Sequence, residues 1–470
     1  MDPRLRGGDE GLTFISMGGP QAHDHSEGNG KRMNRVFILH YHEIWLKGGN
    51  KNYFLSRLRS AIKQSVSDLP VQSLSSVAER LLLVPGEESA APAILERLRR
   101  VLGLAYIASA REVPSALSEL GPAACAMLAE KNPRNFAVRA KIAETGYGMN
   151  SMELERQLGR VILDHLRARD PSVQVNLTNP EVTCSVEVVP GKALIYADRV
   201  DGPGGLPALT SGRLVVLLSG GFDSAVAAYK MMRRGCHAAF VHFFGSPSPS
   251  LDSSRGVAEE IVRTLTPYQF TSRLYLVPFD AVQRQIVAAA PESFRLLLYR
   301  RMMARIAREI ARVERAMGLV TGDSVSQVAS QTLHNLAALD HGLDFPVYRP
   351  LAGDDKAEIL RLARQIGTYK ISCEPFEDCC PRFLPRAPAI FAQPEQLDRA
   401  EAGIDVPALL RMGLEATTVK NFKFEQGSVT VHERMPRRFE KLLPALKTVP
   451  DPALPSPQMD TPLRNGDGRP

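Results

Sequence analysis

The sequence predicts an α/β protein, in which a doubly wound parallel-sheet domain follows two smaller α+β domains. Three observations indicate this. Between residues 213 and 367, apolar segments of strand length alternate with helical segments, which is the pattern of a doubly wound sheet. Two shorter stretches that mix strand and helix patterns precede it. The chain has 470 residues, a length that suggests roughly two to four domains.

Composition excludes several classes of protein. Hydrophobic residues make up 44% and charged residues 23% of the chain, as in an ordinary globular protein. The net charge of +7 weakly favours a polyanionic partner. There is no apolar signal region and no run of 18 apolar residues, so we expect neither secretion nor a membrane span. The six cysteines form no C-x-x-C pair, and we therefore expect a reducing, cytoplasmic location.

The first 113 residues predict a disordered extension followed by a small domain. Residues 1–33 are rich in Gly, Asp, His and Arg, so we expect disorder there. Order should begin near Val36, in a domain spanning 34–113. Its strands are predicted at 36–41, 77–84 and 105–113, and its helix at 51–66. This alternation predicts a ferredoxin-like α+β unit.

A second domain is predicted over 114–203, although its start could lie nearer residue 88. We expect helices at 117–131 and 152–167 and strands at 135–140, 174–177, 184–189 and 193–198. Ser151 is a plausible N-cap for the second of these helices. The Gly-Pro-Gly-Gly run at 202–205 has the composition of a linker.

The third domain is predicted over 212–392. We expect strands at 214–218, 238–244, 274–279 and 319–321, and helices at 223–234, 296–316 and 356–366. The strands are continuous apolar runs, which is typical of a buried parallel sheet. From residue 393 to 470 the patterns weaken, so we expect a C-terminal extension that is disordered from about 450.

The strongest local feature is the segment Ser219-Gly220-Gly221-Phe222-Asp223-Ser224, between a predicted buried strand and a helix. Two glycines let the backbone approach a ligand closely. Hydroxyls and the first helical amides can then surround an anion. The Gly-Lys-Ser/Thr ending of a Walker loop and the G-x-G-x-x-G spacing are both absent. Asp223 could hold the Mg²⁺ that accompanies a triphosphate; alternatively, it only caps the helix.

This segment resembles the pyrophosphate-binding loop, S-G-G-x-D-S, of ATP pyrophosphatases, which adenylate a substrate oxygen. Other segments are similar in order and spacing to the bacterial tRNA 4-thiouridine synthase or thiamine-biosynthesis sulfurtransferase (ThiI) family. Residues 43–48 resemble its opening signature, and residues 151–155 and 179–182 resemble its RNA-binding THUMP domain. The other matching segments lie at 299–303, 321–324, 328–332, 349–351, 355–359, 366–369 and 374–380. The resemblance spans about residues 36–385.

The resemblance implies particular site residues. The implied ATP site consists of Leu217, Leu218, Ser219, Gly220, Gly221, Asp223, Ser224, His242, Phe243, Arg300, Gly322 and Gln331. By pattern alone the two leucines could be plain core, His242 a strand-end histidine and Arg300 a solvated helix residue. The implied catalytic residues are Asp223, Lys356, Cys379 and Cys380. Lys356 would stabilise charge on phosphate, or be a surface lysine. Cys379 aligns with the family's catalytic cysteine, and Cys380 is its reserve; alternatively, both are buried structural cysteines.

The resemblance also implies an activity. ATP, with Mg²⁺, would adenylate O4 of the uridine at tRNA position 8, and persulfide sulfur from a cysteine desulfurase would replace that oxygen to give 4-thiouridine. No C-x-x-C lies near the loop, so we expect no iron–sulfur cluster. No cysteine follows Cys380, so we expect the form without a rhodanese domain. Candidate phosphate contacts are Lys47, Lys51, Arg134, Arg139, Lys141 and Arg156.

Several alternatives stay open at this point. The chain could transfer sulfur to a ThiS-type carrier for thiamine thiazole synthesis, although the longer form associates that role with its rhodanese domain. It could be another tRNA thiolase or a small-molecule adenylating enzyme with the same loop. A non-catalytic RNA-binding protein would predict a degraded loop, whereas the loop is intact. A homodimer is also possible.

Overall fold

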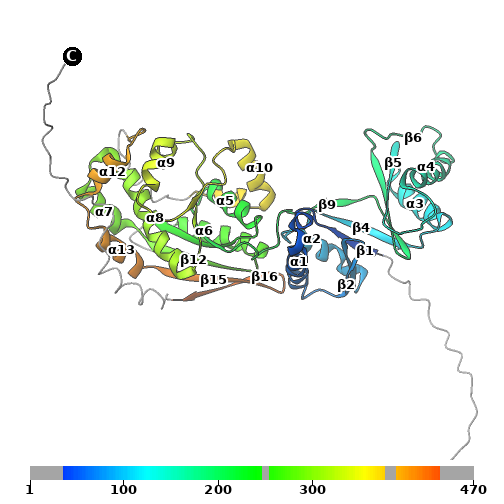
Figure 1. The fold of residues 1–470 in the computed structure, drawn as a ribbon, viewed down its shortest axis with the longest axis horizontal. Coiled ribbons are helices and arrows are strands. Elements are labelled where there is room, and N and C mark those ends of the chain that lie inside the picture. Colours follow the sequence, from blue (N-terminus) through cyan, green and yellow to red (C-terminus); the bar gives the residue numbers. More distant parts are fainter. Residues whose placement is uncertain (1–34, 246–252, 376–387, 435–470) are drawn as a thin grey trace, which may run out of the picture.

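The computed structural model describes residues 35–245, 253–375 and 388–434. Figure 1 shows three parts in a row: an α/β domain, an N-terminal domain beside it, and a middle domain at the far end. The N-terminal domain therefore separates the middle domain from the α/β domain. Cys379 and Cys380 lie outside the described residues, as does the extension at 1–33.

The N-terminal domain has the predicted ferredoxin-like fold. Its elements are β1 (Arg35–His40), α1 (Lys51–Ser65), β2 (Val71–Val77), β3 (Arg80–Pro85), α2 (Ala91–Leu98) and β4 (Tyr106–Val113). The strands pair in the order β2-β3-β1-β4. The single strand expected at 77–84 was wrong, because the chain reverses there. Ala78 and Glu79 form the turn with φ of 42° and 68°. The usual glycine or asparagine of such a turn is missing, so the sequence carried no turn signal.

The middle domain matches the predicted order of elements. It contains α3 (Leu117–Lys131), β5 (Asn135–Ile142), α4 (Ser151–Arg167), β6 (Gln174–Val175), β7 (Val182–Val189), β8 (Lys192–Tyr196) and β9 (Arg199–Asp201). The predicted N-cap was wrong by one residue. Asn150 caps α4, and its side chain accepts a 2.9 Å hydrogen bond from the Glu153 amide. Both residue types cap well, so sequence could not choose between neighbours.

The N-terminal and middle domains share one nine-stranded sheet. Strand β4 pairs with β1 on one side and with β8 and β9 on the other. The Glu187 carboxylate, which is 1% exposed, lies beneath this junction. It accepts a hydrogen bond from the Tyr196 hydroxyl at 2.8 Å and contacts His40 at 3.1 Å and Arg80 at 2.5 Å. Buried polar contacts therefore join strands of both domains.

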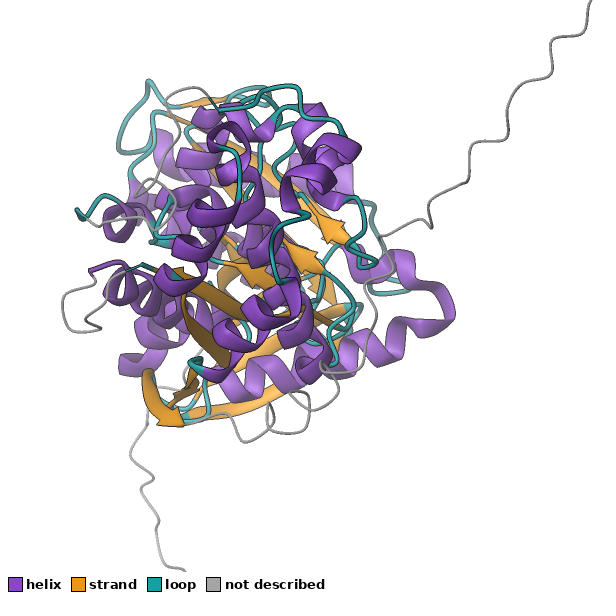
Figure 2. Cartoon of the chain, turned by 90° about the vertical axis from the view of Figure 1, so that its left-hand side faces the viewer, coloured by secondary structure: helices purple, strands orange, loops and turns teal. Residues whose placement is uncertain are grey.

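The α/β domain is doubly wound. Its parallel strands β10 (Arg213–Leu217), β11 (His237–Phe244), β12 (Thr271–Pro278), β13 (Leu319–Val320) and β14 (Val347–Tyr348) have the order β14-β13-β10-β11-β12. Figure 2 shows helices on both sides of the strands. They are α5 (Phe222–Met232), α6 (Ser253–Leu265), α7 (Asp280–Ala289), α8 (Arg295–Glu314), α9 (Leu333–Asp340), α10 (Lys356–Ile366) and α11 (Tyr369–Ser372). The strand order reverses between β10 and β13, where ligands bind in such folds.

The described part of the C-terminal segment completes this domain. The sequence predicted no elements after residue 393, but α12 (Pro394–Glu401), α13 (Val406–Glu415), β15 (Thr418–Glu425) and β16 (Ser428–Arg434) form there. Strand β15 pairs antiparallel with β12. Lysines and asparagine interrupt its apolar residues, since one of its faces is partly exposed. The apolar run that marked the inner strands is therefore missing.

Backbone hydrogen bonds fix the predicted linker to the N-terminal domain on one side and to the α/β domain on the other. The Gly103 amide donates to the Gly204 oxygen, and the Leu206 amide donates to the Arg233 oxygen, both at 2.9 Å. A Cβ on Gly205 would lie 2.1 Å from the Arg233 oxygen, and its φ is +73°. Glycine is thus required by close packing, and the segment is a fixed joint between the N-terminal and α/β domains.

Candidate active site

The Ser219–Ser224 loop connects β10 to α5 and is held by its own hydroxyls. The Ser219 amide donates to the Ser224 Oγ at 3.1 Å, and the Gly221 amide donates to the Ser219 Oγ at 3.2 Å. Gly221 is the N-cap of α5 and has no side chain to bond the first amides. Those amides stay available for an anion, and the helix dipole favours negative charge there.

The Asp223 carboxylate does not cap the helix. Its Oδ1 accepts from the Lys356 Nζ at 2.7 Å, and its Oδ2 accepts from the Gln327 Nε2 at 3.2 Å. Lys356 is the first residue of α10, whose N-cap Asp355 forms a capping box with Glu358. The predicted catalytic pair Asp223 and Lys356 is therefore in direct contact across the loop. The Lys356 Nζ also lies 5.4 Å from the centre of the Phe222 ring.

A cavity of about 210 Å³ opens beside the loop, at the carboxyl ends of the strands. Ten of the twelve residues assigned to the ATP site from sequence line it; Gly220 and Gly221 belong to the loop but not to the lining. Sequence analysis missed three lining residues. The lining consists of Leu217, Leu218, Ser219, Asp223, Ser224, His242, Phe243, Arg300, Met303, Thr321, Gly322, Asp323 and Gln331.

Asp323 organises one wall of this cavity. It is 4% exposed and accepts hydrogen bonds from Arg300 at 2.6 Å, Thr321 at 2.8 Å and Gln331 at 3.0 Å. Burial opposes ionisation, but Arg300, Thr321, Arg349 and Gln331 together hold the pKa of Asp323 below its ordinary value. Arg300 and Gln331 are therefore fixed by a carboxylate, and Arg300 is not a solvated helix residue.

His242 is held on both ring nitrogens. Nδ1 lies 2.9 Å from the Leu218 oxygen, and Nε2 lies 2.9 Å from the Ser254 Oγ. The side chain is buried. It joins β11 to β10 and α6, so it shapes the cavity rather than exchanging protons with a ligand.

Gly322 packs against the backbone of the loop helix. A Cβ at this position would lie 2.6 Å from the Ser224 nitrogen and 2.7 Å from the Asp223 carbonyl carbon. The end of β13 can approach α5 this closely only because residue 322 has no side chain. Gly322 therefore sets the distance between the end of β13 and the start of α5, which form opposite sides of the site.

The remaining predicted residues are spread over the molecule. Lys47 and Lys51 lie near aromatic rings, with their Nζ atoms 5.2 Å from the Phe54 ring centre and 3.6 Å from the Trp45 ring centre. Arg134, Arg139, Lys141 and Arg156 are exposed on the middle domain. Of the cysteines the structure describes, Cys125, Cys184 and Cys236 are buried and Cys373 is exposed.

The described ranges contain neither a metal-binding cluster of side chains nor a membrane-spanning helix. Over residues 35–245, 253–375 and 388–434, no group of three His, Cys, Asp or Glu side chains could hold a metal ion. In the same part of the chain, no helix has the length and hydropathy needed to cross a membrane.

Comparisons with known proteins agree with this arrangement. Family models match a ferredoxin-like domain of the ThiI type at residues 36–108, a THUMP domain at 117–198 and the thiamine biosynthesis protein ThiI at 209–406. A protein named "Probable tRNA sulfurtransferase" from Thermus thermophilus is 40% identical over 82% of this chain and 94% of its own length. One of the same name from Caldanaerobacter subterraneus is 36% identical over 79% and 96%.

A solved structure is also similar along most of the chain. It is described as a 4-thiouridine synthetase–RNA complex with bound ATP. It is 33% identical, with a TM-score of 0.71, over 82% of this chain and 99% of that one. Identity, coverage and the order of the three domains all lead to one conclusion: the chain belongs to the ThiI family of tRNA sulfurtransferases.

Proposed function

We propose that this chain is an ATP-dependent tRNA sulfurtransferase that converts the uridine at tRNA position 8 into 4-thiouridine. The observation that carries this proposal is the cavity beside the Ser219–Ser224 loop, which unites the predicted ATP-site residues with the contacting pair Asp223 and Lys356. The family membership and the RNA-bound, ATP-bound structural relative support it.

The reaction needs activation because a carbonyl oxygen is a poor leaving group. Transfer of AMP from ATP to O4 of uridine releases pyrophosphate and makes that oxygen part of a phosphate that can depart. The amides at the start of α5 and the hydroxyls of Ser219 and Ser224 are placed to bind pyrophosphate oxygens. Lys356 supplies a cation beside them, where charge develops on phosphate.

A Mg²⁺ ion fits the chemistry of the loop. Asp223 offers carboxylate oxygens, the ligand type that Mg²⁺ prefers. When bound, the ion would neutralise triphosphate charge. Asp223 would help to hold it, while Lys356 turns from the carboxylate toward phosphate.

Sulfur enters in a second step. A cysteine desulfurase is the proposed source of a persulfide, whose terminal sulfur attacks C4 of the adenylated uridine and expels AMP. The uridine is then joined by a disulfide to the cysteine that carried the persulfide. A second thiol must attack that cysteine's sulfur to release 4-thiouridine, and an external thiol reductant must reduce the protein disulfide that results. Cys379 is the proposed thiol for this step, and Cys380 is its reserve; neither position lies within the described residues. Transfer to a ThiS-type carrier is the second candidate function. Homodimer formation and the absence of an iron–sulfur cluster remain predictions.

Recognition of tRNA would begin with phosphate contacts from the exposed cations of the middle domain. Arg134, Lys141 and Arg156 are exposed there, while the Arg139 guanidinium already donates to the Leu177 oxygen at 2.6 Å. Folded RNA is read largely by shape. The target base must also leave its stack to reach the cavity.

The decisive experiment compares wild-type protein with Asp223→Ala, measuring pyrophosphate release from ATP with and without tRNA, and 4-thiouridine by nucleoside mass analysis. We expect tRNA-dependent release from wild type. The variant should lose thiolation and keep its tRNA affinity. Arg399→Gln is the control, because Arg399 is exposed on α12 and belongs neither to the loop nor to the candidate tRNA contacts. Normal adenylation by Asp223→Ala in the presence of Mg²⁺ would refute the assignment of the loop.

A further inference from the structure

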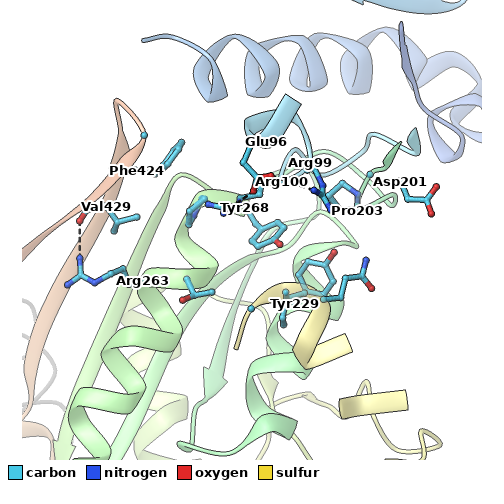
Figure 3. A pocket seen from close by; sticks show the side chains of 17 residues that line it. Glu96, Arg99, Arg100, Asp201, Pro203, Tyr229, Arg263, Tyr268, Phe424 and Val429 are labelled. Carbon is cyan, nitrogen blue, oxygen red and sulfur yellow. Dashed lines mark hydrogen bonds and ion pairs between the residues drawn. The ribbon is translucent and has the colours of Figure 1, made fainter. Parts of the chain in front are cut away.

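A second cavity, of about 440 Å³, lies where the N-terminal domain meets the α/β domain. We call it the joint cavity. The end of α2, the pinned linker, the ends of α5, α6 and α10, and the β15–β16 hairpin surround it (Figure 3). Helix α5 starts at the Ser219–Ser224 loop, and Tyr229, near its other end, lines the joint cavity. Ser224 and Tyr229 are about 7.5 Å apart along the axis of α5, and the two linings share no residue, so the two cavities are separate sites.

Two tyrosines with mostly buried side chains line this cavity. Tyr229 is 2% exposed and Tyr268 is 8% exposed, and their rings meet edge to face at 5.2 Å. Among the described residues, neither hydroxyl has a hydrogen-bond partner, although both residues line the cavity. Neither oxygen is among the buried polar atoms that lack a partner, so both hydroxyls are open to the cavity, where a ligand can reach them. The cavity therefore contains two donors that a ligand can satisfy.

Two arginines, Arg99 and Arg100, line the same cavity as these tyrosines. Arg99 and Arg100 both contact Glu96, at 3.6 Å and 3.3 Å, and remain partly exposed. Burial raises the pKa of Tyr268, and the charges of Arg100, Glu96 and Arg99 also act on that pKa. These charges are therefore within electrostatic reach of the Tyr268 hydroxyl.

The other polar groups of the lining differ in kind. Arg263 is already engaged, since it pairs with Glu260 at 3.2 Å and donates to the Val429 oxygen at 2.9 Å. Gln365 offers an amide, and Asp201 offers a carboxylate on the linker side. A lining of donors, acceptors and aromatic rings suits a ligand that combines a phosphate with a ring bearing hydrogen-bonding groups. A simple anion would leave the amide and the aromatic rings of the lining unused.

We propose that the joint cavity binds one nucleotide unit, with its phosphate on Arg99, Arg100 and the Tyr268 hydroxyl, and its sugar and base toward Asp201 and Gln365. The volume falls within the usual range of about 300–1,000 Å³ for ligand pockets. The nucleotide is either free, such as AMP, or one unit of the RNA substrate. The proposal rests on the proposed function only where RNA is the source.

The test uses the full-length protein with its catalytic cavity saturated by a non-hydrolysable ATP analogue. AMP and inorganic phosphate are titrated separately by calorimetry, and tRNA affinity is measured across a series of salt concentrations. The variants are Tyr268→Phe, which removes only the hydroxyl, and Arg100→Gln. Arg312→Gln is the control, since Arg312 is also partly exposed and pairs with a glutamate within its own helix.

If the nucleotide is free, AMP binds the saturated protein with one further site, and Tyr268→Phe and Arg100→Gln each weaken that binding about tenfold. If the nucleotide belongs to RNA, AMP does not bind. In that case both variants weaken tRNA binding about tenfold, and Arg100→Gln lowers the salt slope by about one.

Two results would overturn the proposal. One is the absence of a second AMP site together with tRNA affinities equal to that of Arg312→Gln. The other is inorganic phosphate binding as tightly as AMP, which would make the cavity a plain anion site. Failure of wild-type protein to thiolate tRNA would refute the proposed function but leave the AMP titration valid.

Discussion

Gly322→Ala should disable the catalytic cavity while leaving the fold in place. Its new Cβ would lie 2.6 Å from the Ser224 nitrogen, 2.7 Å from the Asp223 carbonyl carbon and 2.9 Å from the Ser224 Cα. All three atoms belong to the backbone, so no side chain can turn away to make room. The end of β13 and the start of α5 must therefore move apart.

The expected size of the effect follows from these distances. An ordinary van der Waals contact needs 3.4 Å or more, so the loop has to shift by roughly 1 Å relative to Gly322 and its neighbour Asp323. Overpacking of this kind costs about 1–3 kcal/mol of stability. A misplacement of about 1 Å in a catalytic site can cost roughly 100-fold in rate. We expect the tRNA-dependent release of pyrophosphate to fall by that factor, with a smaller loss of stability.

The assay measures kcat/KM for pyrophosphate release together with the urea midpoint of unfolding. Gly353→Ala is the matched control, because a Cβ there would meet nothing within 4 Å and its φ is not in the left-handed region. It should behave as wild type in both measurements. Equal kcat/KM for Gly322→Ala and Gly353→Ala would refute the close-packing argument.

Three further outcomes are expected. Asp323→Asn should destabilise the protein by about 3 kcal/mol at pH 7, because it removes the carboxylate partner of the mostly buried Arg300 guanidinium. Since the folded pKa of Asp323 is lowered, the difference from wild type should shrink as pH falls below about 4 in urea titrations, and a constant difference would contradict this. The double variant Arg134→Gln/Lys141→Gln should lower the slope of log affinity against log salt for tRNA by up to about two, and an unchanged slope would remove both residues from the interface. Cys379→Ser should still consume ATP in a tRNA-dependent way but give no sustained thiolation, and loss of thiolation in Cys380→Ser alone would move the role by one residue.

Sequence patterns located the inner sheet and the loop because both have strong local signatures. The apolar runs of β10 and β11 reflect burial on both faces, and the two glycines of the loop stand directly before the first residue of α5. The β2–β3 turn was not predicted because Ala78 and Glu79 adopt positive φ, although neither is the glycine or asparagine that usually indicates such a turn. The β15–β16 hairpin was missed because polar residues interrupt the apolar residues of β15, one face of which is partly exposed.

In the candidate site too, some features could be predicted from sequence and others could not. Its members were placed from motifs, but the role of Asp323 depends on Arg300 and Arg349, which meet it from residues 23 and 26 positions away. No local pattern reports such contacts. His242 is similar, because its two partners come from β10 and α6. Sequence could identify these residues as part of the site, but only the folded contacts show which of them support others.

The contact between Asp223 and Lys356 resolves an electrostatic conflict within the loop. A carboxylate among anion-binding amides should repel a triphosphate, but at 2.7 Å the Lys356 ammonium neutralises it. The side chain of Lys356 is 45% exposed and that of Asp223 is 24% exposed, and an ion pair of this kind stabilises a protein by only about 0–1 kcal/mol. Separating the pair therefore costs little when a triphosphate attracts the lysine and a divalent cation attracts the carboxylate. Because the ion pair is weak, Asp223 and Lys356 can contact each other in the absence of ATP and still separate when ATP and a cation bind.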